Sequence, residues 1–167
     1  IVAFAYALGR VGRTVSFLAV DGPHEAKVGD QLIELKMVEV STVEKGEGFY
    51  FLDTGSPHYV RFVEDLSTFD VFDEGRKVRY SDRFKAVGTN VNFVEENPAG
   101  IQVATYERGV EDETLSCGTG IVASTIAYYL HSGASGDFDL PVKARGGDLR
   151  VRFKTNPAGF GDIWLIG

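Results

Sequence analysis

The chain has 167 residues, of which 44% are apolar and 25% charged, and its net charge is −7 at pH 7. These proportions are ordinary for a soluble globular protein, and the length allows one domain or two small ones. The acidic balance argues against a nucleic-acid-binding protein, which needs a basic face to neutralise phosphates. No apolar run approaches the ~20 residues of a membrane span, so we expect no membrane contact.

The chain contains one cysteine, Cys117, and three histidines. A single cysteine cannot form an internal disulfide, which fits a reducing cytoplasm. The histidines and the cysteine show no metal-ligand spacing, so we expect no metal site.

Apolar periodicity and turn residues predict a strand-rich chain with two conspicuous helices. The first helix covers 1–8 and is apolar on nearly all sides, as a helix enclosed by protein would be. The segment 70–80 is ambiguous, with a short helix as one interpretation, and the second conspicuous helix is the apolar run 121–130. Strands are predicted over 14–20, 31–40, 49–52, 58–63, 90–94, 101–107, 138–144, 149–153 and 163–166.

The two apolar helices are each followed by a similar run of elements. After the helix that opens at Ile1 come the strand 14–20, a turn at 21–22 and a strand that ends near Val28. After the helix that opens at Ile121 come the strand 138–144, a glycine-rich hairpin turn and the strand 149–153. This internal repeat predicts two related lobes, and it predicts a counterpart of Cys117 just upstream of Ile1. We therefore expect the chain to be an internal piece of a longer protein.

Cys117 lies where a loop turns into a helix, and Gly-Thr-Gly follows it. Backbone N–H groups at a helix N-terminus favour negative charge, so we expect a thiolate there to be stabilised and its pKa lowered. The same N–H groups can hold a substrate carboxylate. This segment therefore offers a candidate acid/base and a candidate anion site.

Four motifs, taken in order, resemble the diaminopimelate epimerase family. They are Thr-Gly-Ser-Pro-His at 54–58, Gly-Thr-Asn-Val-Asn-Phe at 88–93, Tyr-Glu-Arg-Gly at 106–109 and Cys-Gly-Thr-Gly at 117–120. The resemblance covers nearly the whole chain. It implies an α+β fold of two similar lobes, each a β-barrel-like sheet around a central helix. On this reading, residues 1–43 are the remainder of the first lobe, 44–160 form the second lobe, which carries Cys117, and 161–167 are a strand that returns towards the first lobe.

The same resemblance implies an isomerase that works without pyridoxal phosphate or any other cofactor. Such an enzyme converts L,L-diaminopimelate to the meso form in the cytoplasm, for lysine and peptidoglycan synthesis. The resemblance also implies a homodimer whose ligand is a small diamino acid.

The site residues implied by the resemblance fall into two groups. Cys117 matches the second-lobe member of a pair of catalytic thiols, and His58 and Glu107 match polar residues that assist those thiols. The positions that match substrate-binding residues are Ser56, Asn90, Glu107, Arg108, Gly118 and Thr119. Ser56 stands where many members carry asparagine. The first-lobe cysteine belongs to a Cys-Gly-Asn-Gly segment expected a few residues before Ile1, so we expect the chain alone to be inactive.

Several alternatives stay open at this stage. Proline racemases and phenazine-type isomerases share the implied fold, but the former usually carry proline where this chain has Ser116, and the latter do not rely on a thiol here. A non-catalytic binding protein that lacks one thiol is a further possibility. Arg108 could simply pair with Glu107 or Glu111 on the surface, and Asn90 could only stabilise a turn.

Overall fold

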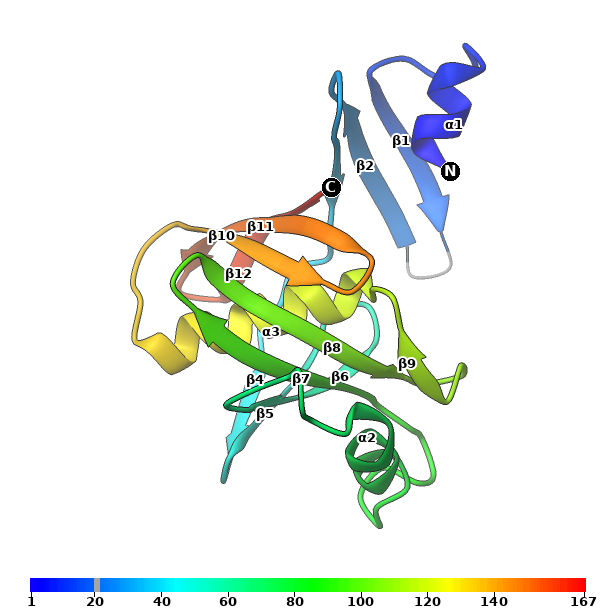
Figure 1. Cartoon of the computed structure of the whole chain (residues 1–167). Coiled ribbons are helices and arrows are strands. Elements are labelled where there is room, and N and C mark those ends of the chain that lie inside the picture. The colour runs from blue at the N-terminus through cyan, green and yellow to red at the C-terminus, as the bar shows by residue number, and fades with distance from the viewer. Residues whose placement is uncertain (20–21) are drawn as a thin grey trace.

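The computed structural model describes residues 1–19 and 22–167 of a mixed α+β protein (Figure 1). The helices are α1 (Val2–Ala7), α2 (Val71–Arg79) and α3 (Gly118–Ser132). The strands are β1 (Thr14–Ala19), β2 (Gly22–Val28), β3 (Ile33–Lys36), β4 (Val43–Gly46), β5 (Phe49–Asp53), β6 (Pro57–Phe62), β7 (Asn90–Asn97), β8 (Gly100–Glu107), β9 (Asp112–Thr114), β10 (Phe138–Ala144), β11 (Gly147–Asn156) and β12 (Gly159–Ile166).

The strands of the described residues form one sheet in the order β1-β2-β3-β12-β11-β10-β8-β7-β6-β5-β4, with β9 beside β8. The pairs β6–β7 and β8–β10 are parallel, and the other neighbours are antiparallel. Parallel neighbours need a crossover connection, and helices α2 and α3 lie in these two crossovers.

Helix α3 occupies the inside of the curved sheet (Figure 1). It contacts strands β5 to β8 on one side and β10 to β12 on the other. Its side chains from Ile121 to Ala127 are all buried, because the sequence of this helix is apolar around nearly its whole circumference. The helix ends at Gly133, whose φ of 72° is the left-handed conformation that glycine adopts without strain. The barrel-like sheet around a central apolar helix agrees with the expected α+β fold.

Helix α2 lies on the outer side of the sheet, away from α3 (Figure 1). Asp70 caps its N-terminus by accepting a hydrogen bond from the Asp73 N–H at 2.9 Å. The buried residue Gly75 lies directly against Tyr106 of β8, where an added Cβ atom would come within 2.3 Å of the tyrosine Cβ. The ambiguous segment 70–80 is therefore a helix, and it packs closely on the sheet.

The first helix is not enclosed as the sequence predicts. Helix α1 contacts β2, but Phe4 is 69% exposed and Leu8 57%, and every residue of α1 is exposed or only half-buried. Within the described residues α1 is therefore covered on one face only. Figure 1 shows α1, β1 and β2 as a group beside the barrel-like body.

Most predicted strands form close to their expected positions, and both predicted hairpins are antiparallel pairs, β1–β2 and β10–β11. The predicted turn at 21–22 falls partly outside the described residues, since Asp21 is not described. The expected strand 31–40 shortens to Ile33–Lys36, followed by an isolated bridge from Val40 to Phe160. The short strands β4 and β9 were not predicted. Within 1–19 and 22–167, none of the helices has both the length and the apolar character that a membrane span requires.

We expect Gly75→Ala to destabilise the intact protein. Alanine favours a helix interior over glycine by about 1 kcal/mol, but overpacking against the Tyr106 ring costs about 1–3 kcal/mol. The measurement is chemical denaturation of the variant beside Gly12→Ala, whose new Cβ would meet only ordinary contacts. A more stable Gly75→Ala protein would contradict the packing of α2 on β8.

Candidate active site at the N-terminus of α3

The candidate site is built on the first turn of α3. Cys117 is the N-cap residue, with an extended backbone, and its carbonyl accepts the first helical hydrogen bond from the Ile121 N–H at 2.8 Å. The N–H groups of 118–120 have no partner within the helix, as at any helix start. The Cys117 side chain is nearly buried, with 9% of the residue exposed. The Cys117 thiol therefore lies beside the N–H donors of the first helical turn.

A chain of side-chain hydrogen bonds leads from the β5–β6 connection to the thiol. His58 Nε2 lies 2.9 Å from Thr119 Oγ1 and 3.0 Å from Ser56 Oγ. Thr119 Oγ1 in turn lies 3.5 Å from Cys117 Sγ. The Thr54 hydroxyl donates to the Thr119 carbonyl at 2.9 Å, which ties this connection to the helix start.

Asn92 fixes which nitrogen of His58 carries the proton. The Asn92 amide nitrogen donates to the Tyr59 carbonyl at 3.1 Å, and the Thr105 hydroxyl donates to the amide oxygen at 2.9 Å. Because a carbonyl can only accept, the amide nitrogen must face β6, where it also lies 3.0 Å from His58 Nδ1. His58 Nδ1 therefore accepts, and the proton resides on Nε2. This proton faces the hydroxyl oxygens of Thr119 and Ser56, and the Thr119 hydroxyl in turn lies beside the thiol sulfur.

Burial keeps His58 neutral. The pKa of His58 is lowered from 6.5 to about 3, chiefly by burial and in part by the positive charge of Arg108. At neutral pH this imidazole is consequently a fixed hydrogen-bond donor rather than a titrating base.

The pKa of Cys117 differs from the sequence expectation. Burial raises the pKa of this thiol above its ordinary value, and the negative charge of Glu107 acts in the same direction. The Thr119 hydroxyl and the backbone N–H groups of Gly120 and Thr119 favour the thiolate, but they do not outweigh burial. The expected lowering is therefore wrong for this chain, because the helix start is enclosed by the sheet rather than open to water.

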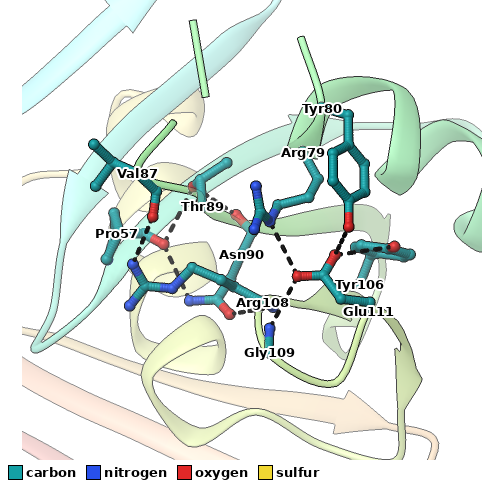
Figure 2. A network of polar contacts seen from close by, with 10 residues as sticks. All are labelled: Pro57, Arg79, Tyr80, Val87, Thr89, Asn90, Tyr106, Arg108, Gly109 and Glu111. Carbon is teal, nitrogen blue, oxygen red and sulfur yellow. Dashed lines mark hydrogen bonds and ion pairs between the residues drawn. The ribbon is translucent and has the colours of Figure 1, made fainter. Parts of the chain in front are cut away.

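Asn90 connects the same site to the loop after β8 (Figure 2). Its amide oxygen accepts from the Arg108 N–H at 2.9 Å, and its amide nitrogen donates to the Pro57 carbonyl and the Ser56 hydroxyl, both at 3.1 Å. The Arg108 guanidinium donates to the Val87 carbonyl at 3.3 Å. Asn90 thus holds the ends of β6 and β8 together rather than stabilising a single turn.

Strand register explains why residues far apart in sequence meet here. In the parallel pair β6–β7, His58 lies opposite Asn90, and in the pair β7–β8, Val91 lies opposite Tyr106. The three strands therefore bring their polar residues to one edge, beside the start of α3. Gly120 allows the close approach, because a Cβ atom there would lie 2.4 Å from Asn92 Oδ1.

The structure brings the expected site residues together in this one region. Contacts join them directly, apart from Glu107, which acts on Cys117 through its charge, and Gly118, which supplies the first residue of α3. The surface-pair interpretation of Arg108 with Glu111 is wrong, since Glu111 pairs with Arg79. The residues so joined are Ser56, His58, Asn90, Arg108, Cys117 and Thr119.

Two residues that organise the site, Thr54 and Asn92, were not predicted as site residues. Both lie inside the motifs at 54–58 and 88–93. A signal was present for Asn92, because Asn90 and Asn92 are two apart on a strand and so share a face. Two amides on one face of an otherwise apolar strand indicate a buried polar network.

Comparisons with known proteins agree on one family. A family model described as diaminopimelate epimerase matches residues 50–159. Among curated proteins, a diaminopimelate epimerase of Flavobacterium psychrophilum is 43% identical over 169 residues, covering 100% of this chain and 66% of that protein. One from Aquifex aeolicus is 41% identical over 140 residues, covering 77% of this chain and 50% of that protein. The matches thus span between half and two-thirds of the length of these relatives.

Solved structures share the fold at low sequence identity. A phenazine biosynthesis protein of the PhzF family from Bacillus anthracis superposes with a TM-score of 0.70 at 10% identity, covering 99% of this chain and 69% of that one. A probable proline racemase from Agrobacterium radiobacter K84 superposes with a TM-score of 0.68 at 15% identity, covering 99% and 62%. At this identity the likeness establishes the architecture alone.

We expect the buried neutral His58 to make folding sensitive to acid. The folded pKa of about 3 lies below the unfolded value of 6.5, so between these pH values the unfolded chain binds a proton that the folded chain does not. Stability is therefore lost as the pH falls below the unfolded pKa, by about 1.4 kcal/mol per pH unit from this residue. The measurement is the free energy of unfolding against pH for wild type and His58→Gln. Equal slopes for the two proteins, together with an imidazole that titrates near its ordinary pKa by NMR, would contradict the assignment.

We expect Glu107→Gln to lower the pKa of Cys117, because the substitution removes a negative charge that disfavours the thiolate. The measurement is the pH dependence of alkylation by iodoacetamide, followed by mass spectrometry of the peptide that carries Cys117. Glu113→Gln, on the neighbouring strand β9, is the matched control. An alkylation profile in Glu107→Gln that is unchanged, or shifted to higher pH, would show that Glu107 does not act on the thiol.

Proposed function

The chain belongs to the diaminopimelate epimerase family, and from this we propose that the protein interconverts L,L- and meso-diaminopimelate by moving a proton at the α-carbon. The observation that carries the proposal is the thiol of Cys117, which lies beside the N–H donors at the start of α3 and is joined to a hydrogen-bonded polar network. This site lies within the residues that the family model matches.

The proposed reaction needs an acid and a base on opposite faces of the α-carbon. The α-proton of an amino acid is far less acidic than a thiol, so the two groups must be held in position for closely coupled transfer. We assign Cys117 as one of these groups. The other is the first-lobe thiol that the family resemblance implies, in a Cys-Gly-Asn-Gly segment before Ile1.

The resting state of Cys117 follows from its surroundings. A raised pKa favours the neutral thiol, so Cys117 rests as the proton donor. Once it has given up its proton, the Thr119 hydroxyl and the N–H groups of the first helical turn face the new thiolate. In the reverse direction the same thiolate takes the proton back, and no cofactor is required.

Charge that develops on the substrate carboxylate needs stabilisation in the same space. The N–H groups of Gly118 and Thr119 and the guanidinium of Arg108 are the proposed donors to carboxylate groups.

Glu107 is the proposed partner of an ammonium group, with Asn90 and Ser56 as further hydrogen-bonding groups. His58 acts through Thr119 rather than by exchanging protons, since it stays neutral.

The remaining features of the proposal concern the whole protein. We propose a cytoplasmic homodimer that takes part in lysine and peptidoglycan synthesis. We further propose that residues 44–160 form the second lobe, that 1–43 belong to the first lobe, and that 161–167 return towards it. The pairing of β12 with both β11 and β3 supports this division, because β12 is the strand that joins the two parts of the sheet.

We expect Cys117→Ala in the intact protein to abolish epimerisation of L,L-diaminopimelate, and with it the incorporation of solvent deuterium at the α-carbon, while the fold is retained. Loss of a catalytic acid/base removes the proton-transfer step itself. The measurement is NMR of the substrate in heavy water, with Ser116→Ala as the matched control because that neighbouring residue is exposed. Turnover by Cys117→Ala at the wild-type rate, or a wild-type protein that leaves the α-proton unexchanged, would overturn the proposal.

A further inference from the structure

Glu111 has an unusual backbone and an unusual number of partners for a loop residue. Its φ is 60°, in the left-handed region that residues with a side chain seldom adopt. Its carboxylate accepts from the Arg79 Nε at 3.2 Å, the Gly109 N–H at 3.1 Å, the Tyr80 hydroxyl at 3.0 Å and the Tyr106 hydroxyl at 3.3 Å (Figure 2). A strained conformation persists only where the surroundings determine it strongly.

We propose that Glu111 is a positioning residue, which fixes the turn that presents Glu107 and Arg108 to the substrate. This inference rests on the proposed function, in which those two side chains bind the amino and carboxylate groups. Glu111 itself does not touch the substrate in this proposal.

The turn is closed by Glu111 at two points. Its backbone N–H donates to the Glu107 carbonyl at 2.8 Å, and its carboxylate accepts from the Gly109 N–H. Between these two bonds lies Arg108, whose own N–H is held by Asn90. The conformation of both proposed substrate-binding residues therefore depends on where Glu111 is held.

Helix α2 supplies the fixed support for Glu111. Arg79 is the last residue of that helix and Tyr80 is its C-cap, while Tyr106 lies on β8. The Arg79 side chain is only 14% exposed, so its charge needs the carboxylate beside it. The side chains of Arg79 and Arg108 both lie close to Gly88. A Cβ atom added at Gly88 would lie 3.0 Å from Arg79 Cζ and 2.6 Å from Arg108 Cδ.

Glu111 is ionised at neutral pH. Burial opposes this ionisation, but the Gly109 N–H, the Tyr80 hydroxyl and the Arg79 charge outweigh burial and hold the pKa of Glu111 below its ordinary value. Hydrogen bonds to an ionised acceptor are about twice as strong as neutral ones. These bonds offset the strain of a left-handed conformation in a residue with a Cβ atom.

The test compares Glu111→Ala with Glu111→Gln and Glu44→Ala in the intact protein, with L,L-diaminopimelate as substrate. Glu111→Ala removes every side-chain hydrogen bond of this residue. Glutamine keeps an oxygen that can accept from Arg79 and Gly109, and its amide nitrogen can donate to the two tyrosine hydroxyl oxygens. Glu44 lies on β4 and forms an exposed ion pair with Arg83, so Glu44→Ala controls for the loss of a surface carboxylate.

We expect kcat/KM of Glu111→Ala to fall about 10- to 100-fold, mainly through KM, because displaced binding groups lower the affinity for substrate. Glu111→Gln should recover to within about 3-fold of wild type, and Glu44→Ala should match wild type. Unchanged KM in Glu111→Ala, or no recovery in Glu111→Gln, would overturn the positioning role. An inactive wild-type protein would instead overturn the proposed function.

A second readout does not depend on turnover. Amide hydrogen exchange at Arg108 and Gly109 should accelerate at least 10-fold in Glu111→Ala, because the turn loses its side-chain closure. If Glu111→Ala does not fold, the double variant Tyr80→Phe and Tyr106→Phe removes two of the four donors without leaving a charge unpaired. Wild-type exchange rates at those amides in both variants would overturn the role of Glu111.

Discussion

Burial of the N-terminus of α3 is the constraint on which the candidate site depends. An apolar helix inside a curved sheet must end somewhere in the interior, and its first N–H groups and every polar side chain nearby then need partners. The sheet supplies partners for the polar side chains from β6 and β7, in the form of His58, Asn90 and Asn92. The polar network is therefore a consequence of where the helix begins, as well as the source of the chemistry.

Backbone groups fix the direction of the hydrogen bonds in that network. Each asparagine is oriented by a carbonyl that can only accept, at Pro57 or Tyr59, so its amide nitrogen has one possible side. The fixed His58 ring then presents its Nε2 proton to the hydroxyls of Ser56 and Thr119, and the Thr119 hydroxyl lies beside the thiol. In a buried site of low dielectric, such fixed dipoles stabilise a developing charge without having to reorganise.

The sequence predicts the helices, the strands and the residues of the candidate site better than it predicts the pKa values and the burial of those residues. Periodicity locates α3 and most strands, and the ordered motifs identify the residues that meet at its start. The pKa of Cys117 was predicted in the wrong direction, because a helix N-terminus is a local feature whereas burial depends on strands 60 residues away in sequence, such as β6 at His58. Composition shows how apolar helix α1 is, but it does not show which surfaces cover the helix. Glu111 was considered only as a surface partner of Arg108, since no local pattern shows that Arg79 and Tyr80 approach it from α2.

The raised pKa of Cys117 is compatible with its proposed role once the substrate is considered as part of the electrostatics. Glu107 disfavours the thiolate only while its own charge is unbalanced. A substrate ammonium group beside Glu107 would cancel that charge and lower the pKa of the thiol at the moment when a proton must leave it. The free site would then hold an unreactive thiol, and substrate binding would activate it. In the proposed mechanism this coupling requires Glu107 to keep a fixed distance from both the ammonium group and the sulfur, and the bonds of Glu111 hold the turn that follows Glu107.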